Sequence, residues 1–171
     1  MGEREKMNEQ QLAVFFEHIY EQHSLHTITF LCIGTDRSTG DALGPLVGSQ
    51  LVDYGVPNVV GTLALPCDAY NLKARFEEIP SDHIVIAIDA CLGQAGSVGS
   101  YLVSQQPLIP AESVGISLPP VGHYSVAAVV NIKGPKPYST LQMTSLYHVM
   151  KMAEQISLSI AKGFKLIKYI D

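Results

Sequence analysis

Two aspartates are the residues of this chain best suited to acid–base chemistry. Asp41 begins the stretch Asp-Ala-Leu-Gly-Pro, and Asp89 follows an apolar run that ends at Ile88. An unpaired buried carboxylate costs free energy, so an acid directly after a buried strand indicates a purpose. Two neighbouring carboxyl groups repel each other's charge, which keeps one of them protonated near neutral pH. The ionised group can take a proton from water while the protonated group polarises a carbonyl, so such a pair can hydrolyse an amide.

Each aspartate also has an ordinary structural interpretation. Asp41 is a suitable N-cap for a helix that begins at Ala42, and Asp89 could cap the turn over residues 91–93. The acid pair is favoured only if the fold brings both residues to the same edge of a sheet.

The elements that must position these acids alternate between helices and strands. Residues 27–33 and 83–88 are apolar and β-branched on both faces, which predicts two buried strands. The remaining patterns predict helices over 8–23, 41–54, 68–78 and 140–164, and shorter strands over 58–65, 99–104, 114–118 and 124–132. This alternation predicts a three-layer α/β/α sandwich with a largely parallel central sheet, in a single domain of residues 1–171.

Ligands of such sheets bind beyond the carboxyl ends of the strands. We therefore expect the loops after Ile33, after Ile88 and near Leu118 to converge on one cleft. The expected cleft residues are Asp36, Asp41, Asp89 and His123. Asp36 and Arg37 are expected either to form a local ion pair that shapes their loop or to contact the substrate.

Three stretches resemble the signature stretches of the spore germination protease family. They are Ile-Gly-Thr-Asp-Arg-Ser-Thr-Gly-Asp-Ala-Leu-Gly-Pro (33–45), Ala-Ile-Asp-Ala (87–90) and Leu-Pro-Pro-Val-Gly (118–122). The whole chain is similar to the shorter YyaC-type sporulation proteins, and the resemblance covers most of residues 27–132. It implies an aspartic-type endopeptidase with Asp41 and Asp89 as its catalytic acids, working in the cytoplasm of a sporulating cell or spore.

The same resemblance implies a fold similar to that of the hydrogenase maturation endopeptidases. Their loop of the form Gly-x6-acid-Ala-x-Gly matches Gly34, Asp41, Ala42 and Gly44. Germination proteases carry an aspartate where this chain has His123, and the hydrogenase endopeptidases complete a metal site with a histidine from a third loop.

Two alternatives to a metal-free acid pair therefore stay open. One is a metal-dependent endopeptidase with Asp41, Asp89 and His123 as ligands, since two carboxylates and an imidazole can hold zinc or nickel. The other is a sporulation regulator or binding module that keeps the fold and does no chemistry. We favour the acid pair without a cofactor, with His123 facing the substrate or orienting the acids.

Other signals are weaker. Cys91 could act as a nucleophile if His123 served as its base. Gly93, Gly96 and Gly99 do not have the G-x-G-x-x-G spacing of a dinucleotide site.

Composition limits the remaining functions. The chain has 171 residues with 11 basic and 16 acidic side chains, a net charge of −5, and 47% hydrophobic residues. This acidic balance disfavours nucleic acid, and the sequence lacks the ~20-residue apolar run of a membrane span. Three cysteines without a C-x-x-C pair favour a reducing cytoplasm. We expect a protein or peptide substrate and leave open whether the protein is a homo-oligomer.

Overall fold

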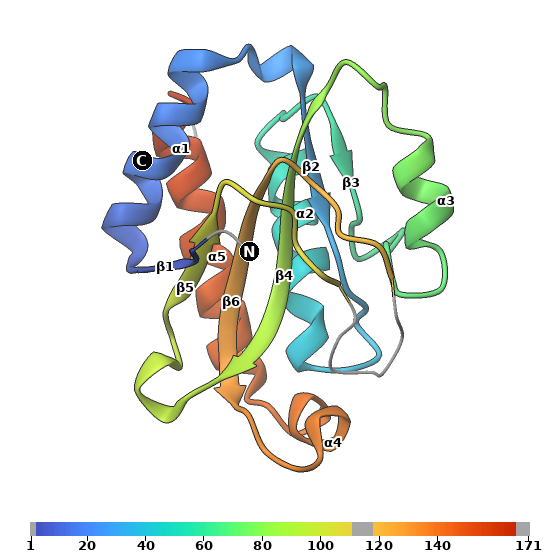
Figure 1. The fold of residues 1–171 in the computed structure, drawn as a ribbon, viewed down its shortest axis with the longest axis vertical. Coiled ribbons are helices and arrows are strands. Elements are labelled where there is room, and N and C mark those ends of the chain that lie inside the picture. Colours follow the sequence, from blue (N-terminus) through green and yellow to red (C-terminus); the bar gives the residue numbers. More distant parts are fainter. Residues whose placement is uncertain (1–2, 111–117, 167–171) are drawn as a thin grey trace.

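A six-stranded sheet forms the centre of the molecule in our computed structural model, which describes residues 3–110 and 118–166 (Figure 1). Its strands lie in the order β1-β5-β6-β4-β2-β3. β6, β4, β2 and β3 are mutually parallel, whereas β5 runs antiparallel to β6 and β1 antiparallel to β5. The strands span Glu5–Met7 (β1), Ile28–Cys32 (β2), Val59–Val60 (β3), Ile84–Gly93 (β4), Tyr101–Ser104 (β5) and Tyr124–Ile132 (β6).

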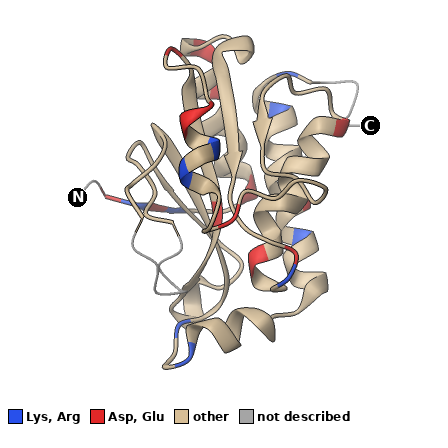
Figure 2. Cartoon of the chain, turned by 90° about the vertical axis from the view of Figure 1, so that its right-hand side faces the viewer, with Lys and Arg blue, Asp and Glu red and all other residues tan. Residues whose placement is uncertain are grey.

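Helices and connecting segments cover both faces of this sheet, as the turned view of Figure 2 also shows. The helices span Glu9–Gln22 (α1), Leu43–Asp53 (α2), Leu72–Glu77 (α3), Pro137–Gln142 (α4) and Leu146–Gly163 (α5). α1, α2 and α5 pack on one face in a large apolar cluster, and α3 packs on the other in a smaller cluster. The predicted three-layer sandwich with a largely parallel sheet is confirmed.

The alternation of side chains along β4 decides which layer each residue meets. Ile86 and Ile88 belong to the large cluster under α1, α2 and α5, whereas Val85 and Ala87 belong to the cluster under α3. Successive side chains of a strand point to opposite faces. Asp89 therefore lies on the α3 face of the sheet.

The C-terminal helical region differs from the prediction of one helix over 140–164. α4 ends at Gln142, and α5 starts at Leu146 after the N-cap Ser145, whose hydroxyl accepts a hydrogen bond from the His148 N–H at 3.3 Å. The break is held by the buried Thr144, which donates to the Thr140 carbonyl and accepts from the Asn131 side chain.

This break changes which residues of the last helix are buried. Leu146 and Met150 fit the apolar stripe of a single helix over 140–164, but they are 56% and 49% exposed. Val149, Ala153 and Ile156, on the same stripe, are buried.

Smaller differences concern element boundaries. Asp68 does not cap a helix but forms a turn, accepting hydrogen bonds from the N–H groups of Tyr70 and Asn71 before α3 begins. The strand expected over 58–65 is reduced to β3, β1 was not predicted, and β4 continues five residues beyond Ile88 to Gly93. Most of the strand expected over 114–118 lies outside the described residues.

The basic side chains do not form one continuous patch in the view of Figure 2. Lys and Arg occur on separate elements rather than along one stripe (Figure 2). Within the described ranges, no helix is both long and apolar enough to cross a membrane.

Candidate active site

The loop that carries Asp41 folds back onto the end of β2. The Thr35 N–H donates to the Asp41 carbonyl at 3.0 Å, and the Gly34 N–H donates to the Cys67 carbonyl at 2.9 Å. Gly34 has φ +145°, and a Cβ at this position would lie 2.0 Å from the Asp41 carbonyl oxygen. A Cβ on Gly44 would lie 2.0 Å from the Ile33 carbonyl oxygen. The spacing Gly-x6-Asp-Ala-x-Gly is therefore a steric requirement of this close approach.

Asp89 lies inside β4 rather than after it. The pairing of β4 with β2 ends at Cys32 and Ile88, whereas its pairing with β6 continues through Asp89 and Ala127. Asp89 thus stands at the first position of β4 beyond the end of β2, where the Asp41 loop leaves the sheet. Its side chain is half-buried, and the Ala90 N–H donates to its Oδ1 at 2.8 Å.

The two carboxyl groups interact electrostatically. Burial raises the pKa of Asp89 well above its usual value, and the charge of Asp41 raises it further. Burial also raises the pKa of Asp41, but the nearby Ser38 hydroxyl opposes that rise. Ser38 Oγ is buried and has no partner within ordinary hydrogen-bond geometry among the described residues, so it stays available to the Asp41 carboxylate.

This environment separates the two acids chemically. Two coupled carboxyl groups in a poorly hydrated site lose their protons one after the other rather than together. The hydroxyl of Ser38 favours the charged form of Asp41, and burial most strongly favours the neutral form of Asp89. At a pH between the two titrations, the pair consists of one carboxylate and one carboxylic acid, which can act as a general base and a general acid.

Cys67 is a neighbour of Asp89 that sequence reasoning missed. The thiol is fully buried, and this burial raises its pKa to about 11; the charge of Arg75 opposes the rise, whereas the charges of Asp68 and Asp89 add to it. Such a thiol remains protonated and does not attack. Nothing in the sequence around Cys67 indicates this position, because it depends on the Ile33–Cys67 bridge at the end of β2.

His123 does not lie beside the two acids, so the expectation that it joins them is wrong. The ring Nδ1 of His123 accepts a hydrogen bond from the Val85 N–H at 2.9 Å, and the backbone N–H of His123 donates to the Val85 carbonyl at 2.7 Å. Val85 lies four residues before Asp89, or about 13 Å along the strand at ~3.3 Å per residue. The reason is the topology of the sheet. His123 directly precedes β6, which is parallel to β4, so His123 lies near the amino-terminal end of β4, whereas Asp89 lies toward its carboxyl end.

The displacement of His123 also affects the two alternatives that depend on it. In residues 3–110 and 118–166, no three His, Cys, Asp or Glu side chains are placed to hold a metal ion. The ligand set of Asp41, Asp89 and His123 is therefore not formed, and we derive no step through a metal. Cys91 likewise lacks His123 as a base, since its strand position is even farther along β4.

Asp36 and Arg37 lie in the Asp41 loop with exposed side chains. The described structure has no ion pair between them, so the expected pair does not shape the loop. The backbone does so instead, through the bonds of Gly34 and Thr35 and a 3.3 Å bond from the Arg37 N–H to Thr35 Oγ1. Contact of Asp36 or Arg37 with a substrate stays a prediction.

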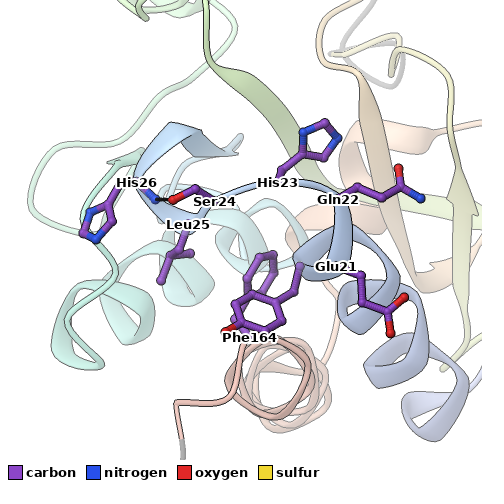
Figure 3. A pocket seen from close by; sticks show the side chains of 8 residues that line it. Glu21, Gln22, His23, Ser24, Leu25, His26 and Phe164 are labelled. Carbon is purple, nitrogen blue, oxygen red and sulfur yellow. Dashed lines mark hydrogen bonds between the residues drawn. The ribbon is translucent and has the colours of Figure 1, made fainter.

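A separate hollow of about 670 Å³ lies between the end of α1 and Phe164 after α5 (Figure 3). His23 and His26 line it but their rings point apart, and it opens next to the start of β2. The acid pair follows the other end of β2, so this hollow is not part of the candidate active site.

The fold is similar to that of a hydrogenase maturation protease. The structure is similar to the crystal structure of the NiFe hydrogenase maturation protease HycI from Thermococcus kodakarensis KOD1, with a TM-score of 0.59 and 19% identity over 88% of this chain and 99% of that chain. The chain belongs to the family described as protein of unknown function DUF1256, which matches residues 2–159.

A curated relative confirms the resemblance to YyaC-type proteins. The chain is 44% identical over 135 residues to the uncharacterized protein YyaC of Bacillus subtilis (strain 168), a match that covers 76% of this chain and 66% of YyaC. The chain thus spans just under two thirds of that relative.

Proposed function

We propose that this protein is an endopeptidase that hydrolyses a peptide bond of a protein substrate with Asp41, Asp89 and a water molecule. The observation that carries the proposal is the coupled acid pair. One acid comes from the loop after β2 and the other from β4, and the charge of the first raises the pKa of the second. The similarity of the fold to a maturation protease supports a protein as the substrate.

The different environments of the two acids assign their roles. Asp41, favoured as a carboxylate by Ser38, takes a proton from water as the water oxygen attacks the carbonyl carbon. Asp89, kept neutral by burial, donates its proton to the carbonyl oxygen and so stabilises the tetrahedral intermediate. The proton held by Asp41 then passes to the amide nitrogen as the C–N bond breaks. Asp89 recovers its proton from the intermediate as the new carboxyl group forms.

The backbone orients Asp89 for this role. The Ala90 N–H holds Oδ1 of the carboxyl group, which leaves Oδ2 as the oxygen that carries the proton. The amide of an asparagine could keep the Ala90 contact through its oxygen but could not pass a proton. Asp89→Asn is therefore a substitution that tests chemistry with little change in shape.

We place the activity in the cytoplasm of a sporulating cell, on the strength of the resemblance to germination proteases. The buried thiols of Cys32 and Cys67 suit a reducing compartment.

The test is to look for new protein N-termini in a substrate mixture. Purified wild type, Asp41→Asn and Asp89→Asn are incubated with an extract of sporulating Bacillus subtilis cells that lack YyaC, and new N-termini are identified by mass spectrometry. Asp82→Asn is the matched control, because it makes the same chemical change at an exposed acid before β4.

We expect new N-termini with wild type and Asp82→Asn and their loss with Asp41→Asn and Asp89→Asn. Equal products from wild type and Asp89→Asn would show that the acid pair is not the catalyst. The absence of products from wild type, with proteins of the extract retained on it, is the result expected of a binding module without chemistry.

A further inference from the structure

Four large apolar side chains at the start of α5 are exposed. Met143 and Tyr147 are 84% and 74% exposed, and Leu146 and Met150 are about half-exposed. The last three recur at the spacing of one helix face, and Met143 lies in the break that precedes them. A group of exposed large apolar side chains marks an interaction site in a folded protein. We call these four residues the apolar patch.

The apolar patch borders the turn that carries Asp41. Both α4 and α5 contact this turn, Gly40–Ala42. Leu141 of α4 is buried, and a Cβ on Gly40 would lie 2.7 Å from its Cδ2. Since Gly40 directly precedes Asp41, a polypeptide held on the patch has its neighbouring segments next to the turn of the first acid.

The charges around the patch are basic, in contrast to the chain as a whole. The chain carries a net charge of −5, but residues 118–153 contain no Asp or Glu and three exposed lysines, Lys133, Lys136 and Lys151. The loop before α4, at the bottom of Figure 2, bears basic and no acidic positions. The end of β6 lies beside the patch, because the Asn131 side chain donates to Thr144 in the break. Carboxylates on a partner would complement these charges.

We propose that the apolar patch is a docking surface for the substrate, where it binds a segment of the polypeptide that carries both apolar side chains and carboxylates. The inference rests on the proposed function, because the docked polypeptide is the one that the acid pair cleaves. The docked segment lies outside the scissile bond. Burial of its apolar side chains supplies affinity, and the lysines select acidic segments.

Two other occupants fit the patch less well. A second copy of this chain, bound through the same patch on both copies, would bring the lysines of the two copies together, and like charges repel. An anionic membrane would attract the lysines but repel a chain whose net charge is −5.

The test follows binding at the patch itself in a protein that cannot cleave. The Asp89→Asn variant, with 13C-labelled methionine methyl groups, is titrated with the blocked peptide acetyl-(Asp-Leu-Ala)4-amide. The comparison peptides are acetyl-(Lys-Leu-Ala)4-amide, which has no acid, and acetyl-(Asp-Ser-Ala)4-amide, which has no large apolar side chain. We expect saturable NMR shifts of Met143 and Met150 with the first peptide and binding about tenfold weaker with the other two.

Variants in the same background locate the binding. Tyr147→Ser should weaken binding of the first peptide about tenfold, because an aromatic anchor is lost. Val14→Ser is the matched control, since it changes a 50% exposed apolar residue of α1, and it should alter binding less than about twofold. With Asp89 intact and a cleaved protein substrate, Tyr147→Ser should raise the KM about tenfold with little change in kcat.

The inference would be overturned by equal binding of the three peptides, by no shift of Met143 and Met150, or by equal weakening in Val14→Ser. A wild-type dimer in ultracentrifugation that Tyr147→Ser makes monomeric would assign the patch to a second copy. Binding to phosphatidylglycerol vesicles that Tyr147→Ser abolishes would assign it to a membrane. Failure of the proposed function is a different result, in which wild type yields no new N-termini although Met143 and Met150 respond to the acidic peptide.

Discussion

At the scale of single residues, Asp89 contributes acidity at the expense of stability. Burial and the neighbouring Asp41 both disfavour its charged form in the folded protein. In the unfolded chain the same carboxyl group titrates near its ordinary pKa. The folded state therefore binds more protons than the unfolded state between these two pKa values, and its stability falls as the pH rises through that window.

The first prediction follows from this linkage. Asp89→Asn removes the buried charge, so we expect it to raise the Tm by about 2–6 °C at pH 8. The advantage should shrink as the pH falls to 4, where the folded protein keeps Asp89 protonated and the unfolded chain begins to take up the same proton. Calorimetry across this pH range measures the effect, with Asp82→Asn as the exposed control. A variant that is less stable than wild type at pH 8 would instead identify Asp89 as a structural cap.

The second prediction concerns the coupling between the acids. Asp41→Asn removes the charge that raises the pKa of Asp89, so that pKa should fall while burial keeps it above the ordinary value. Ser38→Ala should raise the pKa of Asp41, because its hydroxyl favours the carboxylate. NMR titration of 13C-labelled aspartate carboxyl groups measures both. An unchanged titration of Asp89 in Asp41→Asn would mean that the acids do not form a pair.

Residue types and their spacing were enough to select Asp41 and Asp89 but not their neighbours. An acid next to a buried strand is visible in the sequence, because the apolar run marks the strand. The position of Cys67 is not visible, because it depends on a bridge between segments far apart in the chain, and the effect of Ser38 on Asp41 depends on how their loop folds. His123 was misplaced because its context resembled a site loop, while its distance from Asp89 depends on where β6 enters the sheet.

At the scale of elements, the junction of β2 and α2 determines the position of Asp41. The helix begins so close to the strand that the carbonyl oxygens of Asp41 and Ile33 occupy the space of side chains at Gly34 and Gly44. Any side chain at either position must push the loop away from Asp89. This geometry links stability and function in one short segment.

The third prediction tests that junction. Gly34→Ala introduces a Cβ at 2.0 Å from a backbone oxygen and at a φ of +145°, so we expect a loss of about 2–4 kcal/mol and a fall in Tm of about 5–15 °C. Gly96→Ala is the control, because its Cβ would meet nothing within 4 Å. Thermal unfolding of both variants makes the comparison. A Gly34→Ala protein as stable as Gly96→Ala would contradict the close packing of this loop.

Element types were more predictable than element ends. The buried strands and α1 follow from periodicity, and the Asn8–Gln11 capping box fixes the start of α1. The break between α4 and α5 was missed, because residues 140–164 keep a helical pattern and the break depends on the tertiary contact between Thr144 and Asn131. β1 was missed because three residues carry no periodic signal and gain strand form from pairing with β5.

At the scale of the whole molecule, the fold concentrates the acids at one edge. Parallel strands end together, and the longest of them, β4, extends past β2 so that Asp89 faces the loop of Asp41. The large apolar cluster under α1, α2 and α5 supports the sheet on one face, and the smaller cluster under α3 supports it on the other. In the proposed reaction, a polypeptide substrate would lie along this edge.

The fourth prediction is the most direct test of the central claim, that Asp41 and Asp89 together direct water to a peptide bond. A synthetic peptide that spans a mapped cleavage site is incubated in H2-18O with wild type, Asp41→Asn, Asp89→Asn and Asp82→Asn, and 18O in the new carboxyl group is followed by mass spectrometry from pH 4 to 9.

We expect one 18O atom per cleavage and a bell-shaped pH dependence for wild type and Asp82→Asn, because one acid must be ionised and the other protonated. Each acid variant should lose about 10²–10⁴-fold in rate. Cleavage by Asp89→Asn at the wild-type rate would contradict the account.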